Sequence, residues 1–164
     1  MSSQFTITTF ATGLNWPLGM VTLKDSSILV AITEDTAFFS STAGHLVRLA
    51  DTDSDGVANT RDTLAANILS GRLSALVRGG DLVVTTGQGS GHHILIYHLG
   101  NNATDSLALQ GTITLTCPSG SWNHPHSGLG IRQTPDVANS YDLLISAGSV
   151  VNDVESDSTL AMRQ

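Results

Sequence analysis

The sequence predicts an all-β protein. Short runs rich in Val, Ile, Leu and Thr alternate with turn residues along most of the 164-residue chain, which contains 16 glycines. No segment keeps the hydrophobic period of an amphipathic helix. The expected strands, in chain order, are residues 5–10, 18–23, 28–32, 45–49, 73–78, 82–86, 94–98, 111–116, 129–132 and 143–146.

Six of these strands form three similar units, each with a short strand, a polar turn and a more apolar strand. The units begin at Leu18, Leu73 and Leu129, which are 55 and 56 residues apart. Blades of β-propellers repeat at roughly 40–50 residues, and more with insertions. The spacing therefore predicts propeller blades that begin near residues 18, 73 and 129. An ordinary sandwich with three similar hairpins is the alternative, and the even spacing argues against it.

Three blades are too few for a closed ring, because propellers usually have four to eight. We therefore expect residues 1–164 to form one partial domain, about three blades of a six-bladed β-propeller. Unpaired strand edges invite pairing with another chain, so a homodimer that completes the ring is the expected assembly. A truncated product or a fragment is the alternative.

An acidic segment, residues 51–62, has the pattern of a calcium-binding loop. Carboxylates alternate at its start, and Gly56 permits the sharp turn that brings a backbone carbonyl inward. Ca²⁺ takes six to eight oxygen ligands, and the expected ones come from Asp51, Asp53, Asp55, Val57 (through its carbonyl), Asn59 and Asp62. The last position departs from an EF-hand, which has Glu there. We expect a structural metal, with a metal-free acidic turn as the alternative.

Composition excludes several partners. The net charge of −7 disfavours binding to nucleic acid or to an anionic membrane. No apolar run approaches the roughly 20 residues of a transmembrane helix. Cys117 is the only cysteine, so no internal disulfide forms. Residues 1–4 lack the features of a signal peptide, which leaves the compartment open between a cytosolic protein and one whose leader is absent.

Residues 10–20 (Phe-Ala-Thr-Gly-Leu-Asn-Trp-Pro-Leu-Gly-Met) resemble the first blade of the glucose/sorbosone dehydrogenase family. Members of this family are six-bladed propellers, and many use pyrroloquinoline quinone (PQQ). Residues 28–30 fit the strand that follows, and residues 44–62 resemble the family's calcium-loop region. His126-Ser127-Gly128 is similar to a family motif whose histidine is the catalytic base. The resemblance covers nearly the whole chain, but only the N-terminal half of a family member.

This resemblance implies half of a PQQ-dependent dehydrogenase that oxidises small-molecule sugars, calcium as a second cofactor, and an extracytoplasmic location. Two departures matter. Gly148 is followed by Ser149, where the family commonly has an Asp that orients the base. The family's cationic quinone-binding residues lie mostly in the second half, so no cofactor-binding residue is assigned here.

The candidate active site is the polar run 122–128. His126 is the expected base and His124 the alternative, because the pKa of imidazole lies near neutral pH. Trp122 is expected to stack on a sugar face. The competing interpretation is that both histidines are loop residues bonded to the backbone. His92 and His93 follow a glycine-rich stretch that we expect to be a flexible inter-strand loop.

Two other functions compete with sugar oxidation. One is a non-enzymatic, calcium-stabilised propeller module that binds carbohydrate or a protein partner through its loops. The weaker one is a calcium-dependent lactonase of similar architecture, which would need a metal at the ring axis.

Overall fold

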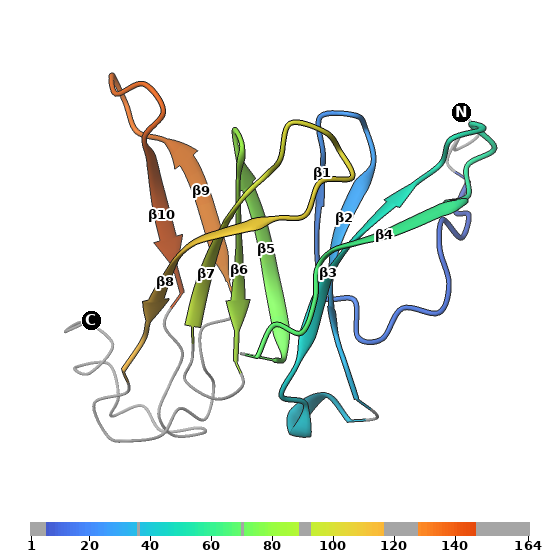
Figure 1. The fold of residues 1–164 in the computed structure, drawn as a ribbon, viewed down its shortest axis with the longest axis horizontal. Coiled ribbons are helices and arrows are strands. Elements are labelled where there is room, and N and C mark those ends of the chain that lie inside the picture. Colours follow the sequence, from blue (N-terminus) through green and yellow to red (C-terminus); the bar gives the residue numbers. More distant parts are fainter. Residues whose placement is uncertain (1–5, 36, 70, 89–92, 117–127, 147–164) are drawn as a thin grey trace, which may run out of the picture.

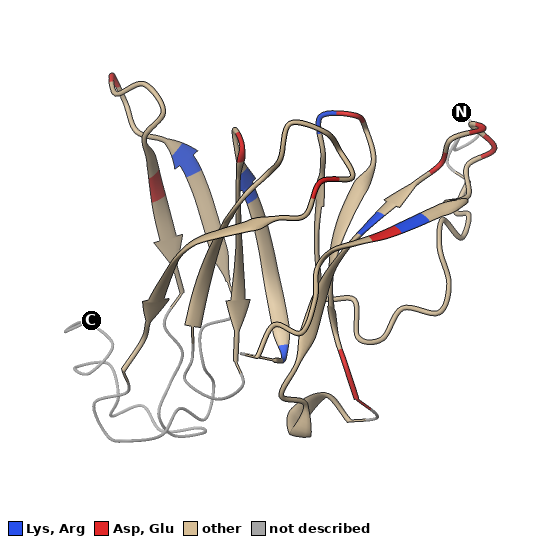
Figure 2. Ribbon diagram, in the orientation of Figure 1, with Lys and Arg blue, Asp and Glu red and all other residues tan. Residues whose placement is uncertain are grey.

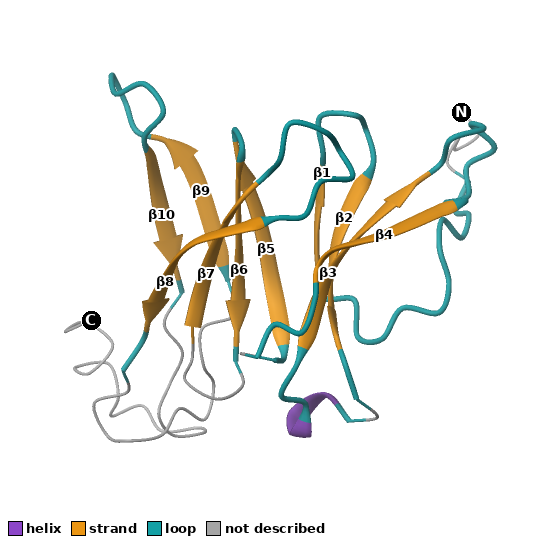
Figure 3. Ribbon diagram, viewed as in Figure 1, coloured by secondary structure: helices purple, strands orange, loops and turns teal. Residues whose placement is uncertain are grey.

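The computed structural model describes residues 6–35, 37–69, 71–88, 93–116 and 128–146. These residues form an all-β structure of three antiparallel sheets (Figure 3), and their one helix is a single 3₁₀ turn, η1 (Phe38–Ser40). In the described part of the chain, no helix has the length and apolar character needed to cross a membrane.

Two of the sheets are four-stranded meanders in which each strand pairs with the next along the chain (Figure 1). The strands of the first sheet are β1 (Gly19–Thr22), β2 (Ile28–Thr33), β3 (Gly44–Ala50) and β4 (Thr60–Ala65). The strands of the second sheet are β5 (Leu73–Gly79), β6 (Leu82–Gly87), β7 (His93–His98) and β8 (Ala108–Thr114). The third sheet is a hairpin of β9 (Leu129–Gln133) and β10 (Tyr141–Ile145).

The sheets contact one another through their first strands. Strand β1 contacts β5, and β5 contacts β9. Glycine makes both approaches close: a Cβ on Gly19 would lie 2.7 Å from the backbone nitrogen of Leu76, and one on Gly79 would lie 2.8 Å from the side chains of Ile131 and Tyr141. Since any side chain at position 19 would meet the β5 backbone, the glycine there allows β1 and β5 to lie this close together.

The main core lies between the first and second sheets. Strand β2 alternates its side chains with the two-residue period of a strand, so that Leu29 is buried on this side and Val30 on the other. The residues of the main core that are fully buried include Leu29, Ala31, Leu46, Leu73 and Val83. A smaller cluster of Val30, Val47 and Leu49 fills the outer face of the first sheet.

The segment of residues 9–14, which we call the strap, covers that outer cluster. Phe10, Ala11 and Leu14 pack against it, and the Ala58 N–H donates to the Phe10 carbonyl at 2.8 Å. Residues 6–10 form no strand, so the predicted strand over residues 5–10 is wrong for this described part. The backbone there is tied to a loop rather than to a strand, and its apolar side chains serve as a cover.

Strand β4 was not predicted from the sequence, because Thr60-Arg-Asp-Thr-Leu-Ala65 alternates few apolar residues. Its pairing with β3 makes it a strand, with Ala50 opposite Thr60 and Arg48 opposite Asp62. The acidic segment is consequently shorter as a loop than the sequence pattern predicts, since its last three residues belong to β4.

Candidate metal centre

The candidate metal centre is the loop that joins β3 to β4 (Figure 2), where acidic residues gather at the tip of the hairpin. Two sets of hydrogen bonds close the base of this loop. The Asn59 N–H donates to the Ala50 carbonyl at 3.0 Å. The Asn59 Oδ1 accepts from the Thr52 N–H at 3.0 Å and from the Thr52 hydroxyl at 2.9 Å. The hairpin thus presents residues 51–58 as a defined, exposed turn.

Three carboxylates of the loop lie together. Asp51, Asp53 and Asp55 each place a carboxylate oxygen within 4.8 Å of those of the other two. Two oxygens on opposite sides of one Ca²⁺ are at most about 5.2 Å apart, because each bond is about 2.3–2.6 Å. The spacing and the hard oxygen donors therefore fit calcium, and these three residues would hold it.

The loop backbone orients Asp51. Its carboxylate accepts the N–H groups of Gly56 at 2.8 Å, Ser54 at 2.7 Å and Asp55 at 3.3 Å. The Gly56 N–H is the largest cause that holds the pKa of Asp51 below its usual value. Gly56 has φ +89°, a conformation that L side chains rarely adopt. The sequence prediction that this glycine permits the turn agrees with this geometry.

Asp62 lies apart from these three carboxylates. It is on β4, directly opposite Arg48 on β3, and it accepts a hydrogen bond from Arg48 Nη1 at 2.7 Å. Asn59 is likewise engaged at the base of the loop with Thr52. The structure thus brings together three of the predicted ligands and gives Asp62 and Asn59 other partners. The Val57 backbone donates to Asp55 Oδ1 at 2.8 Å, which keeps Val57 beside the group.

Arg48 is the centre of a largely buried ion cluster below the loop. Its guanidinium also donates to Asp25 Oδ2 at 2.6 Å and to the Ser27 hydroxyl at 3.0 Å. Burial alone would raise the pKa of Asp25, but the hydrogen bonds from Ser27 and Arg48 outweigh it and lower that pKa. The cluster ties the β1–β2 turn to β3 and β4. An Arg and an Asp at facing positions of a hairpin were the signal that sequence analysis missed.

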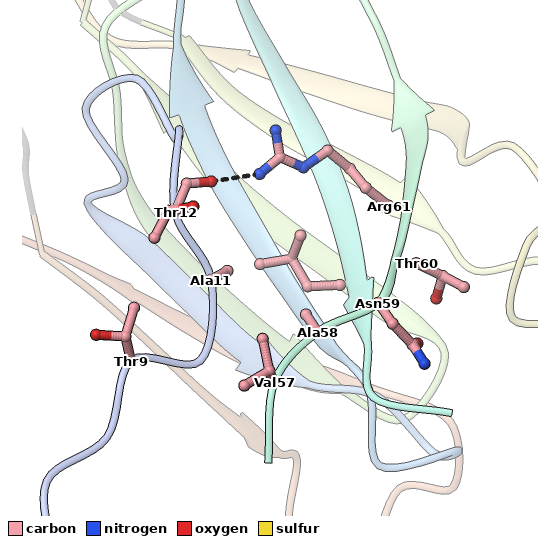
Figure 4. A pocket seen from close by; sticks show the side chains of 9 residues that line it. Thr9, Ala11, Thr12, Val57, Ala58, Asn59, Thr60 and Arg61 are labelled. Atoms are coloured by element: carbon pink, nitrogen blue, oxygen red, sulfur yellow. Dashed lines mark hydrogen bonds between the residues drawn. The ribbon is translucent and has the colours of Figure 1, made fainter. Parts of the chain in front are cut away.

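A cavity of about 210 Å³ separates the hairpin from the strap (Figure 4). Thr9, Ala11 and Thr12 line one side, and residues 57–61 line the other. Arg61 bridges the two, because its Nη2 donates to the Thr12 carbonyl at 2.7 Å, the bond drawn in Figure 4. The candidate metal loop is thereby connected to the segment that covers the outer core.

The predicted catalytic residues His126 and His124, and the predicted sugar-stacking residue Trp122, lie outside the described residues, as does His92. His93 is on β7, and its Nδ1 is 3.2 Å from the Thr114 hydroxyl on β8. It is the first residue of β7, one residue before the strand expected over residues 94–98.

His45 uses both ring nitrogens within the fold. Its Nδ1 accepts from the Asn67 N–H at 3.3 Å, and its Nε2 is bonded to Glu34. Since an acceptor Nδ1 carries no proton, Nε2–H is the donor to Glu34. Such a histidine has no free nitrogen for catalysis.

No protein-family model matches the sequence, and no curated protein or solved structure is significantly similar to it. The resemblance of residues 10–20 to a dehydrogenase family stays a prediction, and the function must be argued from the geometry.

Proposed function

We propose that this chain is a calcium-stabilised segment of a β-propeller. Two successive four-stranded meanders and a third hairpin support the propeller, because their first strands contact in order from β1 to β5 to β9. Propellers are built from repeated four-stranded sheets around an axis. The third sheet begins at Leu129, as the second begins at Leu73, so one sheet follows another at the spacing of the sequence repeat.

The observation that carries the calcium proposal is the group of three carboxylate oxygens from Asp51, Asp53 and Asp55 at one exposed hairpin tip. Three like charges within 4.8 Å repel one another, and a divalent cation relieves that repulsion. Binding to the folded state alone stabilises it by about 2.7 kcal/mol when the free ligand is at 100 times its dissociation constant. The metal therefore acts by fixing the hairpin.

Isothermal titration with CaCl₂, followed by scanning calorimetry in CaCl₂ and in EGTA, tests this proposal. We expect a higher melting temperature with calcium and loss of the calorimetric binding signal in Asp51→Ala. Titration with MgCl₂ is the matched control, since Mg²⁺ demands a stricter octahedral geometry and gives up its water reluctantly. An unchanged transition, together with no bound calcium by elemental analysis, contradicts the proposal.

Sugar oxidation with a quinone cofactor is the second candidate function. It rests on the sequence resemblance, and Gly128 is the one residue of the His126-Ser127-Gly128 motif that the structure describes. Its N–H donates to the Ser146 hydroxyl at 2.8 Å, and its carbonyl accepts the Ser146 N–H at 2.9 Å. The motif therefore ends at a fixed point beside the start of β9, the first strand of the third sheet.

In this function His126 would take the proton from the anomeric hydroxyl of the sugar as a general base, and His124 is the alternative. Bound PQQ would supply the two-electron acceptor chemistry. Trp122 would stack on the sugar. The assay is dye reduction with aldoses as PQQ is added, in wild type and in the two histidine variants. We expect His126→Ala to lose about 10²–10⁴-fold in turnover, and His124→Ala to lose less.

Full activity in His126→Ala with loss in His124→Ala would move the base two residues upstream. Sugar binding without quinone-dependent turnover would instead favour the non-enzymatic module. No observation on the described residues supports the lactonase alternative. That function would need a metal at the ring axis, whereas the group of three carboxylates lies at a hairpin tip.

We propose that a second copy of the chain can supply the remaining three sheets of a six-bladed ring. Among the described strands, β10 pairs only with β9, and Leu144 on β10 is 62% exposed. An open edge of this kind favours strand pairing between chains, and two copies related by a two-fold axis would supply six sheets. Light scattering tests the homodimer, and a well-folded monomer at micromolar concentration would exclude it.

A further inference from the structure

A second concave site lies beside the first strand and is lined by residues that precede the acidic loop in the chain. It has a volume of about 550 Å³ and is lined by Leu14, Asn15, Trp16 and Asp35. Two segments form it, the one that leads into β1 and the one that follows β2. They are joined by a hydrogen bond from the Thr33 N–H to the Asn15 carbonyl at 3.2 Å. The walls of the site are thus held by the first sheet.

Trp16 forms an aromatic platform in this site. Its ring is 6.1 Å from that of Phe38 at an interplanar angle of 57°, and Phe38 in turn packs edge-on against Phe39 at 5.4 Å. Phe38 does not line the concavity, so it supports the indole from outside the site. Trp16 nevertheless remains 45% exposed. A large aromatic ring that is supported but open offers a flat, preorganised contact surface.

The backbone at this site is strained on both walls. Trp16 has φ +45° and Asp35 has φ +87°. Left-handed conformations are uncommon for residues other than glycine, and for a bulky residue they are genuine outliers. Strain of this kind persists where the surrounding structure enforces it, and it clusters at ligand sites. Here both residues with positive φ line the same concavity.

Trp16, Asn15 and Asp35 therefore line one concavity. We propose that the Trp16 site binds a neutral pyranose sugar. The C–H groups on one face of the sugar would pack on the electron-rich face of the indole. The side-chain amide of Asn15 carries both a donor and an acceptor, which are the groups that pair with a sugar hydroxyl.

The alternative ligand is an organic ammonium ion, because the site contains a carboxylate and an aromatic ring. Aromatic cages for such ions surround the cation with several rings, whereas Trp16 is the one aromatic among the described residues that line this concavity. A cage would also leave the Asn15 amide donor unused. A single platform with polar groups at its side is the arrangement that suits a sugar.

Sugar binding at Trp16 does not require the sugar oxidation proposed above, and the probe separates the two. Methyl α-D-glucopyranoside and its galacto and manno analogues have no free anomeric hydroxyl, so they bind without being oxidised at C1. Saturation-transfer NMR and ligand titration followed by heteronuclear NMR on the full chain measure binding. We expect millimolar affinity for at least one of these glycosides, with little dependence on salt.

Trp16→Ala should weaken that binding by about tenfold or more, and Trp16→Phe should retain part of it. Asn15→Ala provides a second variant in case Trp16→Ala fails to fold, and it should also weaken binding. Leu69→Ala is the control, since Leu69 is 79% exposed and lies outside both the concavity and the aromatic stack. It should bind like wild type.

Three results overturn the proposal. One is the absence of binding to all three glycosides. Another is unchanged affinity in both Trp16→Ala and Asn15→Ala. The third is tighter binding of tetramethylammonium with a steep loss at high salt, which would assign the site to a cation. None of these outcomes bears on the calcium or quinone tests, which use other residues and other readouts.

Discussion

Asp53→Ala and Asp62→Ala should cause two different kinds of loss, although both carboxylates lie in the same twelve-residue acidic segment. Asp53 belongs to the carboxylate group at the hairpin tip, while Asp62 bonds Arg48 at 2.7 Å. Removing Asp53 should mainly remove the stabilisation that calcium provides. Removing Asp62 should lower the free energy of unfolding whether or not calcium is present.

The size of the Asp62 effect follows from its surroundings. The Arg48 side chain is 11% exposed and that of Asp62 is 36% exposed, so solvent screens part of the attraction. Breaking a fully buried pair costs about 3–5 kcal/mol. Because Arg48 keeps its bond to Asp25 in the variant, we expect a loss of about 1–2 kcal/mol. For a chain of this length, that lowers the melting temperature by roughly 2–8 °C.

Scanning calorimetry of wild type and both variants, each in CaCl₂ and in EGTA, measures the two effects separately. Asp62→Ala should show the lower melting temperature in both buffers and should keep the calcium-induced rise. Asp53→Ala should melt close to wild type in EGTA and should lose most of that rise. If Asp62→Ala instead melts like wild type in EGTA and loses the calcium-induced rise in melting temperature, then Asp62 is a metal ligand. Its assignment as a structural partner of Arg48 would then be wrong.

Three further perturbations test the packing and the ion cluster. Gly19→Ala should lower the free energy of unfolding measured with denaturant by about 1–3 kcal/mol, because the added methyl meets the β5 backbone, which cannot rotate away. A variant as stable as wild type would contradict the close approach of β1 and β5. Leu29→Ala, at a fully buried site, should lower the free energy of unfolding by about 2–5 kcal/mol. Leu144→Ala, at an exposed site, should lower it little in monomeric protein. Equal losses in the two variants would argue against the core described here. The folded-state pKa of Asp25 is depressed, so its contribution to stability is complete above the unfolded pKa near 4 and is lost as pH falls through the folded pKa. Asp25→Asn should therefore be less stable at pH 7, and its free energy of unfolding from urea melts should fall less steeply with acid than that of wild type. An unchanged dependence on acid would show that another group dominates it.

Much of the strand pattern could be predicted from the sequence, because it is encoded locally. The alternation around Leu29 and Val30 gives a two-faced strand, and the leading Leu73 and Leu129 are the first residues of β5 and β9. These features depend on the period of apolar residues and on the turns between them. The all-β class follows from the same local signals.

The errors arise where a distant partner decides the structure. Residues 6–10 have the composition of a strand, but Phe10 bonds Ala58 in a loop and packs over the outer core. Strand β4 has few apolar residues, and it is defined by its pairing with β3. The spacing of the acidic residues predicted Asp62 as a metal ligand. Spacing alone cannot distinguish a ligand in a loop from a strand residue that lies opposite Arg48.

The strap has a consequence for how the chain is synthesised. Its Thr12 carbonyl accepts from Arg61, 49 residues later in the chain, and Phe10 accepts from the same hairpin. At about 5–20 residues per second, a ribosome needs roughly 2–10 seconds to make the intervening residues. During that interval Phe10 and Leu14 have no hairpin against which to dock. A nascent chain with an arrest site placed so that Arg61 has not left the exit tunnel should therefore keep these apolar residues open to chaperones, and release of the hairpin should end that exposure.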